Sequence, residues 1–448
     1  MKARFADRQR AGLFLFLAAY ACVLAGLLPL LSLWLDEIYD LIVARMDSLS
    51  ELLAYVPHVS GQAPLHYMMQ FWSVHLLGSP AVSGRLPSVI SSLAACVGIF
   101  FLARKLGLRW PLLAVGIFAL FPLQLRYALE ARPYELALCL SIWATVAFLR
   151  VIERPESVLR AALYSLCVTA GLYTFPYTLF VPLAHLAWVS LELLQGKQGW
   201  RPLFTAGLAV GIAGLLFAPW YLHSAALWHE AVVAGHLRGT IGLRAIPMIL
   251  RELLAAGYIG SLLVLGGFVY GLVRRRDRLL WLLYAIVPIV CAVAADAWFG
   301  YFLAIRQMIF VLAPLAVMFT AGVGELFASR PKAAQALAGA LLIACLAGNV
   351  SFFRRPRENW RAAASILITE PCVVYSPPTS RELYTFFIPA LAARECSPGT
   401  VPRVALAVSP YPVNNPLAQQ RRQLQEFGYV QRGELNPATP LIEIYVRP

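Results

Sequence analysis

The chain begins with a continuous apolar stretch that runs directly into acidic residues: GLFLFLAAYACVLAGLLPLLSLWLDEIYD, residues 12–40. Its first part, residues 12–31, holds no charged side chain and reaches the roughly 20 residues that one helical crossing of a bilayer requires. Asp36 and Glu37 follow shortly afterwards, so two adjacent carboxylates are expected at the membrane boundary. Ionisable groups so close to hydrocarbon are costly, and they usually mark chemistry or cation binding.

The rest of the chain repeats this apolar pattern. Of its 448 residues, 60% are hydrophobic and only 13% are charged, and the mean hydropathy is +0.69. Soluble domains carry roughly 25% charged residues, so the composition excludes that class. We expect a mainly α-helical, polytopic membrane bundle of about eleven spans, at residues 12–31, 86–102, 110–125, 134–149, 159–173, 175–194, 202–222, 246–273, 279–295, 308–326 and 333–352.

The net charge of +14 does not indicate a nucleic-acid partner. Basic residues occur in short clusters between apolar spans, which is typical of loops that stay in the cytoplasm beside membrane lipids. With a cytoplasmic N-terminus, the inner loops hold Arg104, Lys105, Arg109, Arg150, Arg154, Arg160, Lys197, Arg201, Arg274, Arg275, Arg276, Arg278, Arg330 and Lys332. An odd number of spans then places the C-terminus on the outer side.

Beyond about Arg354 the apolar runs give way to prolines, arginines and polar residues. β-type runs at 372–375, 404–408 and 441–446, with a helical segment at 417–427, predict a small α/β domain. We therefore expect a membrane domain, 1–353, with a first outer loop at 32–85, and an outer domain, 354–448. An oxidising compartment would permit a disulfide between Cys372 and Cys396 of this domain, a pairing that the sequence leaves open.

A short helix is predicted from Asp36 to Arg45 or beyond. On such a helix Asp36 and Asp40 share a face, and Glu37 is turned away by about 100°. Asp36 could be the N-cap of this helix, but a cap needs one carboxylate and not three, which favours a functional interpretation. The three carboxylates could also hold Mg²⁺ or Mn²⁺, although the sequence requires no cofactor.

The remainder of the first outer loop contains an amphipathic segment, residues 64–72, that begins with Pro64, a residue suited to a first helical turn. This segment is expected to lie along the membrane surface, with its aromatic residues as interfacial anchors. His58 and Gln62 precede it. Together with Asp40 they are candidate substrate-binding residues.

A second polar group is predicted on the outer side, between the third and fourth spans. Arg126 and Arg132 lie there with Tyr127 and Tyr134, and Arg306 adds a cation at the outer end of the tenth span. Arginine in such a place suits bidentate binding of an anion such as phosphate. The alternative is a salt-bridged turn in which Glu130 pairs with one of the arginines.

Taken together, these motifs resemble bacterial glycosyltransferase family 39, the protein O-mannosyltransferase-like group within the GT-C class of membrane glycosyltransferases. The resemblance rests on Asp36-Glu37, on Gln-Ala-Pro-Leu-His-Tyr at 62–67, on Tyr-Ala-Leu-Glu-Ala-Arg-Pro-Tyr at 127–134, on Arg306, and on Asn-Trp-Arg-Ala-Ala at 359–363. These motifs follow the family order over nearly the whole chain. Departures from the usual pattern occur at Ala63, His66, Gln307 and Asn359.

The resemblance implies an enzyme that transfers a sugar from a polyprenyl-phosphate donor to an envelope acceptor on the non-cytoplasmic face of the bacterial inner membrane. The acceptor hydroxyl would belong to a lipid, a glycan or a protein. Asp36 would act as general base with Glu37 assisting. Arg126, Arg132 and Arg306 would hold the donor phosphate, and a single attack would invert the sugar carbon. A transporter or flippase of lipid-linked sugars, and a scaffold for an envelope partner, remain alternatives.

Overall fold

The computed structural model describes residues 2–58, 63–234, 251, 257–275, 277–299, 304–355, 357–410, 416–435 and 440–448. The chain forms two compact units. The first comprises Met1–Leu28 and Met46–Phe352, and the second comprises Pro29–Arg45 and Phe353–Pro448. The segment Pro29–Arg45, which the sequence assigned to the membrane domain and its first outer loop, thus groups with the C-terminal residues.

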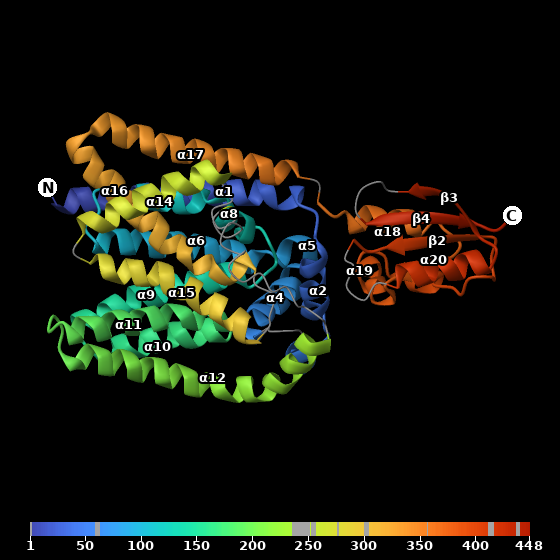
Figure 1. Ribbon diagram of the computed structural model, residues 1–448, viewed down its shortest axis with the longest axis horizontal. Helices are drawn as coiled ribbons and strands as arrows, with labels where there is room; N and C mark the ends of the chain where they lie inside the picture. The colour runs from blue at the N-terminus through green and yellow to red at the C-terminus, as the bar shows by residue number, and fades with distance from the viewer. Residues whose placement is uncertain are drawn as a thin grey trace. The chain divides into compact units, whose positions relative to one another are not determined.

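The first unit is a bundle of helices, several of which are broken by short 3-10 turns. Figure 1 shows its long helices running side by side, with α12 and α17 at opposite edges. The helices are α1 (Lys2–Leu27), α3 (Leu49–Tyr55), α4 (Pro64–Leu77), α5 (Pro80–Ser83), α6 (Leu86–Lys105), α7 (Pro111–Leu120), α8 (Pro122–Ala128), α9 (Tyr134–Glu153), α10 (Val158–Leu172), α11 (Phe180–Leu194), α12 (Trp200–Ala234), α14 (Gly257–Arg274), α15 (Arg278–Phe299), α16 (Leu312–Ser329) and α17 (Pro331–Arg354), with 3-10 turns η1 (Leu28–Leu30), η2 (Val56–His58), η3 (Pro176–Leu179) and η5 (Ile305–Val311).

Among the described residues, nine helices are long and apolar enough to cross a membrane, so the protein is a multi-pass membrane protein as predicted. The two other predicted spans are also helical. The third span is bent by 71° between α7 and α8, where Pro122 begins a new helix because it cannot continue the first. The fifth span, α10, has only 15 residues, which at about 1.5 Å per residue is shorter than the hydrocarbon core. The predicted span 246–273 is helical from Gly257, and all but Arg251 of its earlier residues lie outside the described ones.

The N-terminus and two of the connections between helices lie at the same end of the bundle. Figure 1 shows the N-terminus and the connections α11–α12 and α16–α17 at the same end of the first unit. These connections carry Lys197 and Arg330, two residues of the predicted cytoplasmic loops. Both loops therefore lie at the same end of the bundle, and their cytoplasmic position stays a prediction.

Helix α16 lies in the core of the bundle, because every residue from Leu312 to Val323 is buried. Helix α14 approaches it closely at three glycines. A Cβ atom on Gly271 would overlap the carbonyl oxygen of Met318, and one on Gly322 would overlap the carbonyl oxygen of Gly267. Small residues allow such contacts between membrane helices, where dispersion contacts replace the hydrophobic driving force.

A buried polar network joins four helices next to the predicted arginine cluster. Gln124 of α8 donates to the Ser92 hydroxyl at 2.6 Å and to the Glu135 carboxylate at 3.1 Å. Its carbonyl oxygen accepts a hydrogen bond from the Tyr20 hydroxyl at 3.1 Å. Because lipid offers no hydrogen bonds, such groups must be satisfied within the protein. The network therefore anchors α8 and the start of α9 to α1 and α6.

The second unit contains a four-stranded sheet of order β1-β2-β4-β3, in which β1 and β2 are parallel and the other pairs are antiparallel. This confirms the predicted small sheet and helices at the C-terminus. Strand β3 was not predicted. The helices, 3-10 turns and strands of the second unit are α2 (Leu35–Ala44), α18 (Trp360–Leu367), β1 (Val373–Ser376), η6 (Pro378–Ser380), α19 (Arg381–Thr385), η7 (Pro389–Arg394), β2 (Arg403–Val408), α20 (Leu417–Glu426), β3 (Val430–Leu435) and β4 (Leu441–Val446).

The sheet buries one apolar core with Cys372, Leu406, Leu424 and Tyr445. Cys372 forms a disulfide with Cys396, with a Cα–Cα distance of 5.5 Å. The pairing that the sequence left open is therefore made. The bridge supplements a core that is small for an independent domain.

Candidate active site

The loop between α8 and α9 is buried, and hydrogen bonds from two neighbouring helices hold its backbone in place. The side-chain amide of Gln70 in α4 donates to the Ala131 carbonyl at 3.0 Å, and the Ser88 hydroxyl of α6 donates to the Arg132 carbonyl at 3.2 Å. Pro133 is the N-cap residue of α9 and ends the loop. These bonds fix the backbone that carries Arg132 and Tyr134.

Two segments far apart in the sequence place arginines around two tyrosine rings. The Arg132 guanidinium lies 5.4 Å from the centre of the Tyr134 ring, and its Nη2 donates to the Tyr134 hydroxyl at 3.0 Å. Arg306, in η5, lies 5.6 Å from the same ring. The rings of Tyr127 and Tyr134 meet edge to face at 5.0 Å. Cation–π contacts of this kind hold guanidinium groups without neutralising them.

Arg126 also belongs to this group, and it forms the salt bridge with Glu130 that was the alternative prediction for this loop. Its Nε forms an ion pair with the Glu130 carboxylate at 2.9 Å, and its guanidinium lies 5.5 Å from the Tyr127 ring. Glu130 is fully buried. Arg126 is therefore partly committed to a salt-bridged turn, whereas the contacts of Arg132 and Arg306 described above are to aromatic groups.

Three guanidinium groups, those of Arg126, Arg132 and Arg306, therefore lie around the two tyrosine rings. Arginines gathered in this way suit bidentate binding of an anion such as phosphate. The predicted residues Arg126, Arg132, Arg306, Tyr127 and Tyr134 thus come together in the first unit.

His66, which the sequence did not single out as a site residue, belongs to the same region. It is fully buried, and neither ring nitrogen forms a hydrogen bond of good geometry among the described residues, although the Gln70 side chain lies nearby. Burial and the nearby charge of Arg132 lower the pKa of its imidazole to about 3, so the ring is neutral at pH 7. A buried polar group without a partner costs free energy, which makes His66 a candidate for contact with a ligand.

His58 is exposed in η2, where its ring is 6.2 Å from that of Tyr55. None of the contacts of the described residues joins His58 to the arginine–tyrosine group. The other predicted residue of this segment, Gln62, lies outside the described residues.

The predicted carboxylates lie in the second unit, on α2. The N-cap of this helix is Trp34 and not Asp36, so the structural role considered for Asp36 is wrong. Glu37 is fully buried and accepts a hydrogen bond from the Trp34 backbone N–H at 3.4 Å, while Asp36 is half-buried. Asp40 is also buried.

The C-terminal residues hold the first turn of α2 in place. The Glu358 carboxylate accepts hydrogen bonds from the Leu35 backbone N–H at 3.0 Å and from the Trp360 indole N–H at 2.6 Å. A carboxylate at a helix N-terminus satisfies a backbone N–H and opposes the positive end of the helix dipole. The position of Asp36 in this unit therefore depends on a residue more than 300 positions later in the chain.

Within the described part of the chain, no group of three His, Cys, Asp or Glu side chains is arranged to hold a metal ion. Asp36, Glu37 and Asp40 do not form such a group. Use of Mg²⁺ or Mn²⁺ stays a prediction.

The sequence matches no protein-family model and no protein with a curated description. Solved structures, in contrast, are similar over almost the whole chain. ArnT from Cupriavidus metallidurans in the apo state is 12% identical with a TM-score of 0.61, over 98% of this chain and 98% of that chain. The same protein bound to undecaprenyl phosphate gives a TM-score of 0.62 at 12% identity, over 97% and 98% of the two chains.

A third similar structure is the archaeal oligosaccharyltransferase AglB from Archaeoglobus fulgidus, in complex with an inhibitory peptide and a dolichol-phosphate. It is 10% identical with a TM-score of 0.59, over 90% of this chain and 70% of that chain. Identities this low establish the fold alone. The chain therefore has the GT-C fold, the polytopic helical architecture of membrane glycosyltransferases.

Proposed function

We propose that the protein transfers a sugar from a polyprenyl-phosphate donor to an acceptor hydroxyl on the non-cytoplasmic face of the bacterial inner membrane. The observation that carries this proposal is the convergence of Arg132 and Arg306 on the Tyr134 ring within a GT-C fold. The ArnT and AglB structures are named as complexes with undecaprenyl phosphate and a dolichol-phosphate. A polyprenyl phosphate is therefore the ligand class that the fold favours.

The donor phosphate is assigned to Arg132 and Arg306, with Arg126 and the neutral His66 ring beside them. When the bond between the sugar C1 and the phosphate oxygen breaks, the bonding electrons leave with the phosphate, whose negative charge increases. Guanidinium groups already held by aromatic rings can stabilise this charge without reorganising. Tyr127 and Tyr134 support the arginines and line the same region.

Asp36 is assigned as the general base. It removes the proton from the acceptor hydroxyl as the oxygen attacks C1 from the face opposite the phosphate, so the reaction inverts that carbon. Its partial exposure supports this role. Glu37 is engaged with the Trp34 backbone and is better suited to orienting the helix. Asp40, His58 and Gln62 are assigned to substrate contacts.

The two predicted domains would divide this work. The membrane domain, 1–353, holds the lipid-linked donor, and the outer domain, 354–448, faces the acceptor, which is a lipid, a glycan or a protein. The bond from Glu358 to the first turn of α2 supports a direct part for the C-terminal residues in catalysis, because it positions the helix of the proposed base.

The test uses purified protein in nanodiscs with a panel of polyprenyl-phosphate sugars radiolabelled in the sugar, and with envelope extract as acceptor source. A transferase moves label from the lipid to an acceptor and releases polyprenyl phosphate. A transporter or flippase leaves the donor intact, although it moves it between leaflets. Donor binding without any turnover over the whole panel would contradict the proposal.

A further inference from the structure

A charged cleft lies in the first unit, among helix ends that lead into the predicted cytoplasmic loops. It has a volume of about 520 Å³ and is lined by the ends of α6, α9 and the start of α10. Its polar lining residues are Arg104, Lys105, Arg150, Glu153 and Arg160. A volume of this size lies within the range of small-molecule sites.

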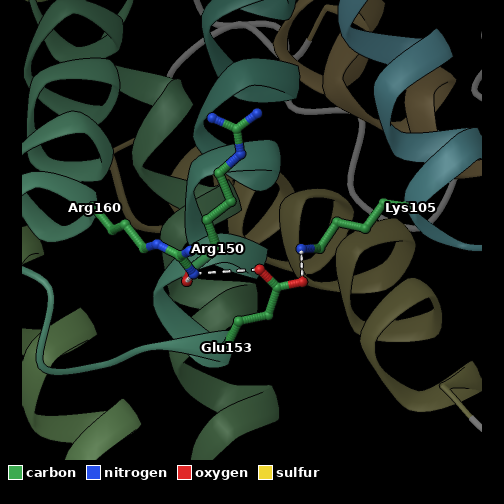
Figure 2. A network of polar contacts seen from close by, with 4 residues as sticks. All are labelled: Lys105, Arg150, Glu153 and Arg160. Atoms are coloured by element: carbon green, nitrogen blue, oxygen red, sulfur yellow. Dashed lines mark hydrogen bonds and ion pairs between the residues drawn. The ribbon is translucent and has the colours of Figure 1, made fainter.

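The single carboxylate of the cleft is shared by two of its four cations. Lys105 pairs with Glu153 at 2.5 Å and Arg160 pairs with it at 3.3 Å, as Figure 2 shows. Arg160 also donates to the Arg150 backbone carbonyl at 2.7 Å. One negative charge against four positive charges leaves a clear excess of positive charge at the cleft.

Arg150 is the cation best placed to take an external ligand. Figure 2 shows its guanidinium directed away from Glu153, and in the described part of the chain no hydrogen bond or ion pair involves this side chain. Among the described residues, the Arg104 guanidinium lies 5.8 Å from the centre of the Phe100 ring. Arginine presents a planar pair of donors that fits a phosphate diester.

The rest of the lining is apolar and open to the surroundings. Leu159 is 70% exposed, Leu163 is 41% exposed and Phe101 is 40% exposed. In a membrane bundle such side chains face acyl chains. A ligand in this cleft would therefore place an anionic group among the arginines and a hydrocarbon part against these three residues.

We propose that this cleft binds the headgroup of one anionic phospholipid. The retention of positive charge on the cytoplasmic side explains why each loop carries basic residues. It does not explain why four basic residues from three helices line the same cleft around one carboxylate. Basic pockets between transmembrane helices on the cytoplasmic side are known sites for anionic headgroups. The apolar rim favours a lipid over a free phosphate ion.

The experiment measures lipid binding to the delipidated full-length protein in detergent by native mass spectrometry. The probes are dioleoyl phosphatidylglycerol, dioleoyl phosphatidylcholine and inorganic phosphate. The wild type should bind one phosphatidylglycerol at least tenfold more tightly than phosphatidylcholine. Arg150→Gln should reduce that affinity about 10- to 150-fold, because it removes a charge-assisted hydrogen bond to the lipid phosphate. Arg150→Lys should keep part of it.

Arg201→Gln is the matched control, since Arg201 is exposed at the start of α12 in another predicted cytoplasmic loop and is not part of the cleft lining. It should bind phosphatidylglycerol as the wild type does. Arg104→Gln serves as the second cleft variant if Arg150→Gln fails to fold. Equal affinity for the two lipids, equal losses in the Arg150 and Arg201 variants, or binding of inorganic phosphate as tight as that of the lipid would each overturn the proposal.

Discussion

Replacing Arg132 by glutamine separates two roles that this side chain could have. One role is structural, because its Nη2 donates to the Tyr134 hydroxyl at 3.0 Å. The other is the proposed contact with the donor phosphate. Tyr134→Phe removes the structural bond and leaves the guanidinium charge in place, so the pair of variants distinguishes the roles.

The expected magnitudes differ. A hydrogen bond from a charged group to the phosphate contributes about 1.5–3 kcal/mol, and about 1.4 kcal/mol corresponds to tenfold in rate. Arg132→Gln should therefore lower kcat/KM for the polyprenyl-phosphate sugar by about 10- to 150-fold. Tyr134→Phe loses only an intramolecular bond of about 0.5–1.5 kcal/mol and should cost less than about tenfold. Arg132→Lys should fall between them, because a point charge replaces a bidentate donor.

The assay follows transfer of radiolabelled sugar at several donor concentrations, with thermal unfolding in detergent measured on each variant. Arg132→Gln is expected to lower kcat more than it raises KM, since the phosphate charge grows in the transition state. Equal losses in Arg132→Gln and Tyr134→Phe would refute the phosphate role and leave Arg132 as a structural residue.

Three further outcomes are expected. Glu358→Ala removes the acceptor for the Leu35 N–H and should lower sugar transfer about tenfold with unchanged donor binding; wild-type transfer would contradict the proposed support of α2. Replacing Cys372 and Cys396 together by alanine should destabilise the second unit by about 3–4 kcal/mol, because the bridge closes a loop with a sequence separation of 24, and an unchanged unfolding transition would rule this out. His66 has a folded pKa of about 3 and an ordinary pKa of 6.5, so the unfolded chain binds more protons between these values and stability falls as the pH is lowered through that window. From pH 7 to pH 5 the wild type should lose about 2 kcal/mol through this group, and thermal unfolding of His66→Asn should lack that part of the loss; an identical pH profile would show that His66 is not buried as described.

The spans could be predicted because the property that makes a membrane helix, a long apolar run, is local in the sequence. The arginine–tyrosine group could be predicted for a related reason. Arginines at the outer ends of spans must find partners or ligands there, whichever helices surround them. For this reason the sequence predicts a common anion-binding role for Arg132 and Arg306, although the two residues lie on segments far apart in the chain.

Other features depend on tertiary contacts and could not be read in this way. Strand β3 is almost fully exposed and carries the polar sequence Val-Gln-Arg-Gly-Glu-Leu, so it shows no apolar alternation. The sequence predicts that His66 belongs to an amphipathic surface segment, whereas tertiary packing buries it near Arg132. The bond between Glu358 and α2 joins residues that no local pattern connects.

The most direct test of the proposed mechanism compares Asp36→Asn with the wild type in a single-turnover reaction with a donor identified from the panel. Loss of the base should lower the rate of sugar transfer by about 10²–10⁴-fold, while the affinity for the donor stays within about twofold because the phosphate contacts are assigned to the arginines. Glu37→Gln, which keeps an acceptor for the Trp34 N–H, should retain more activity. Transfer by Asp36→Asn at the wild-type rate would contradict the assignment of Asp36 as the base.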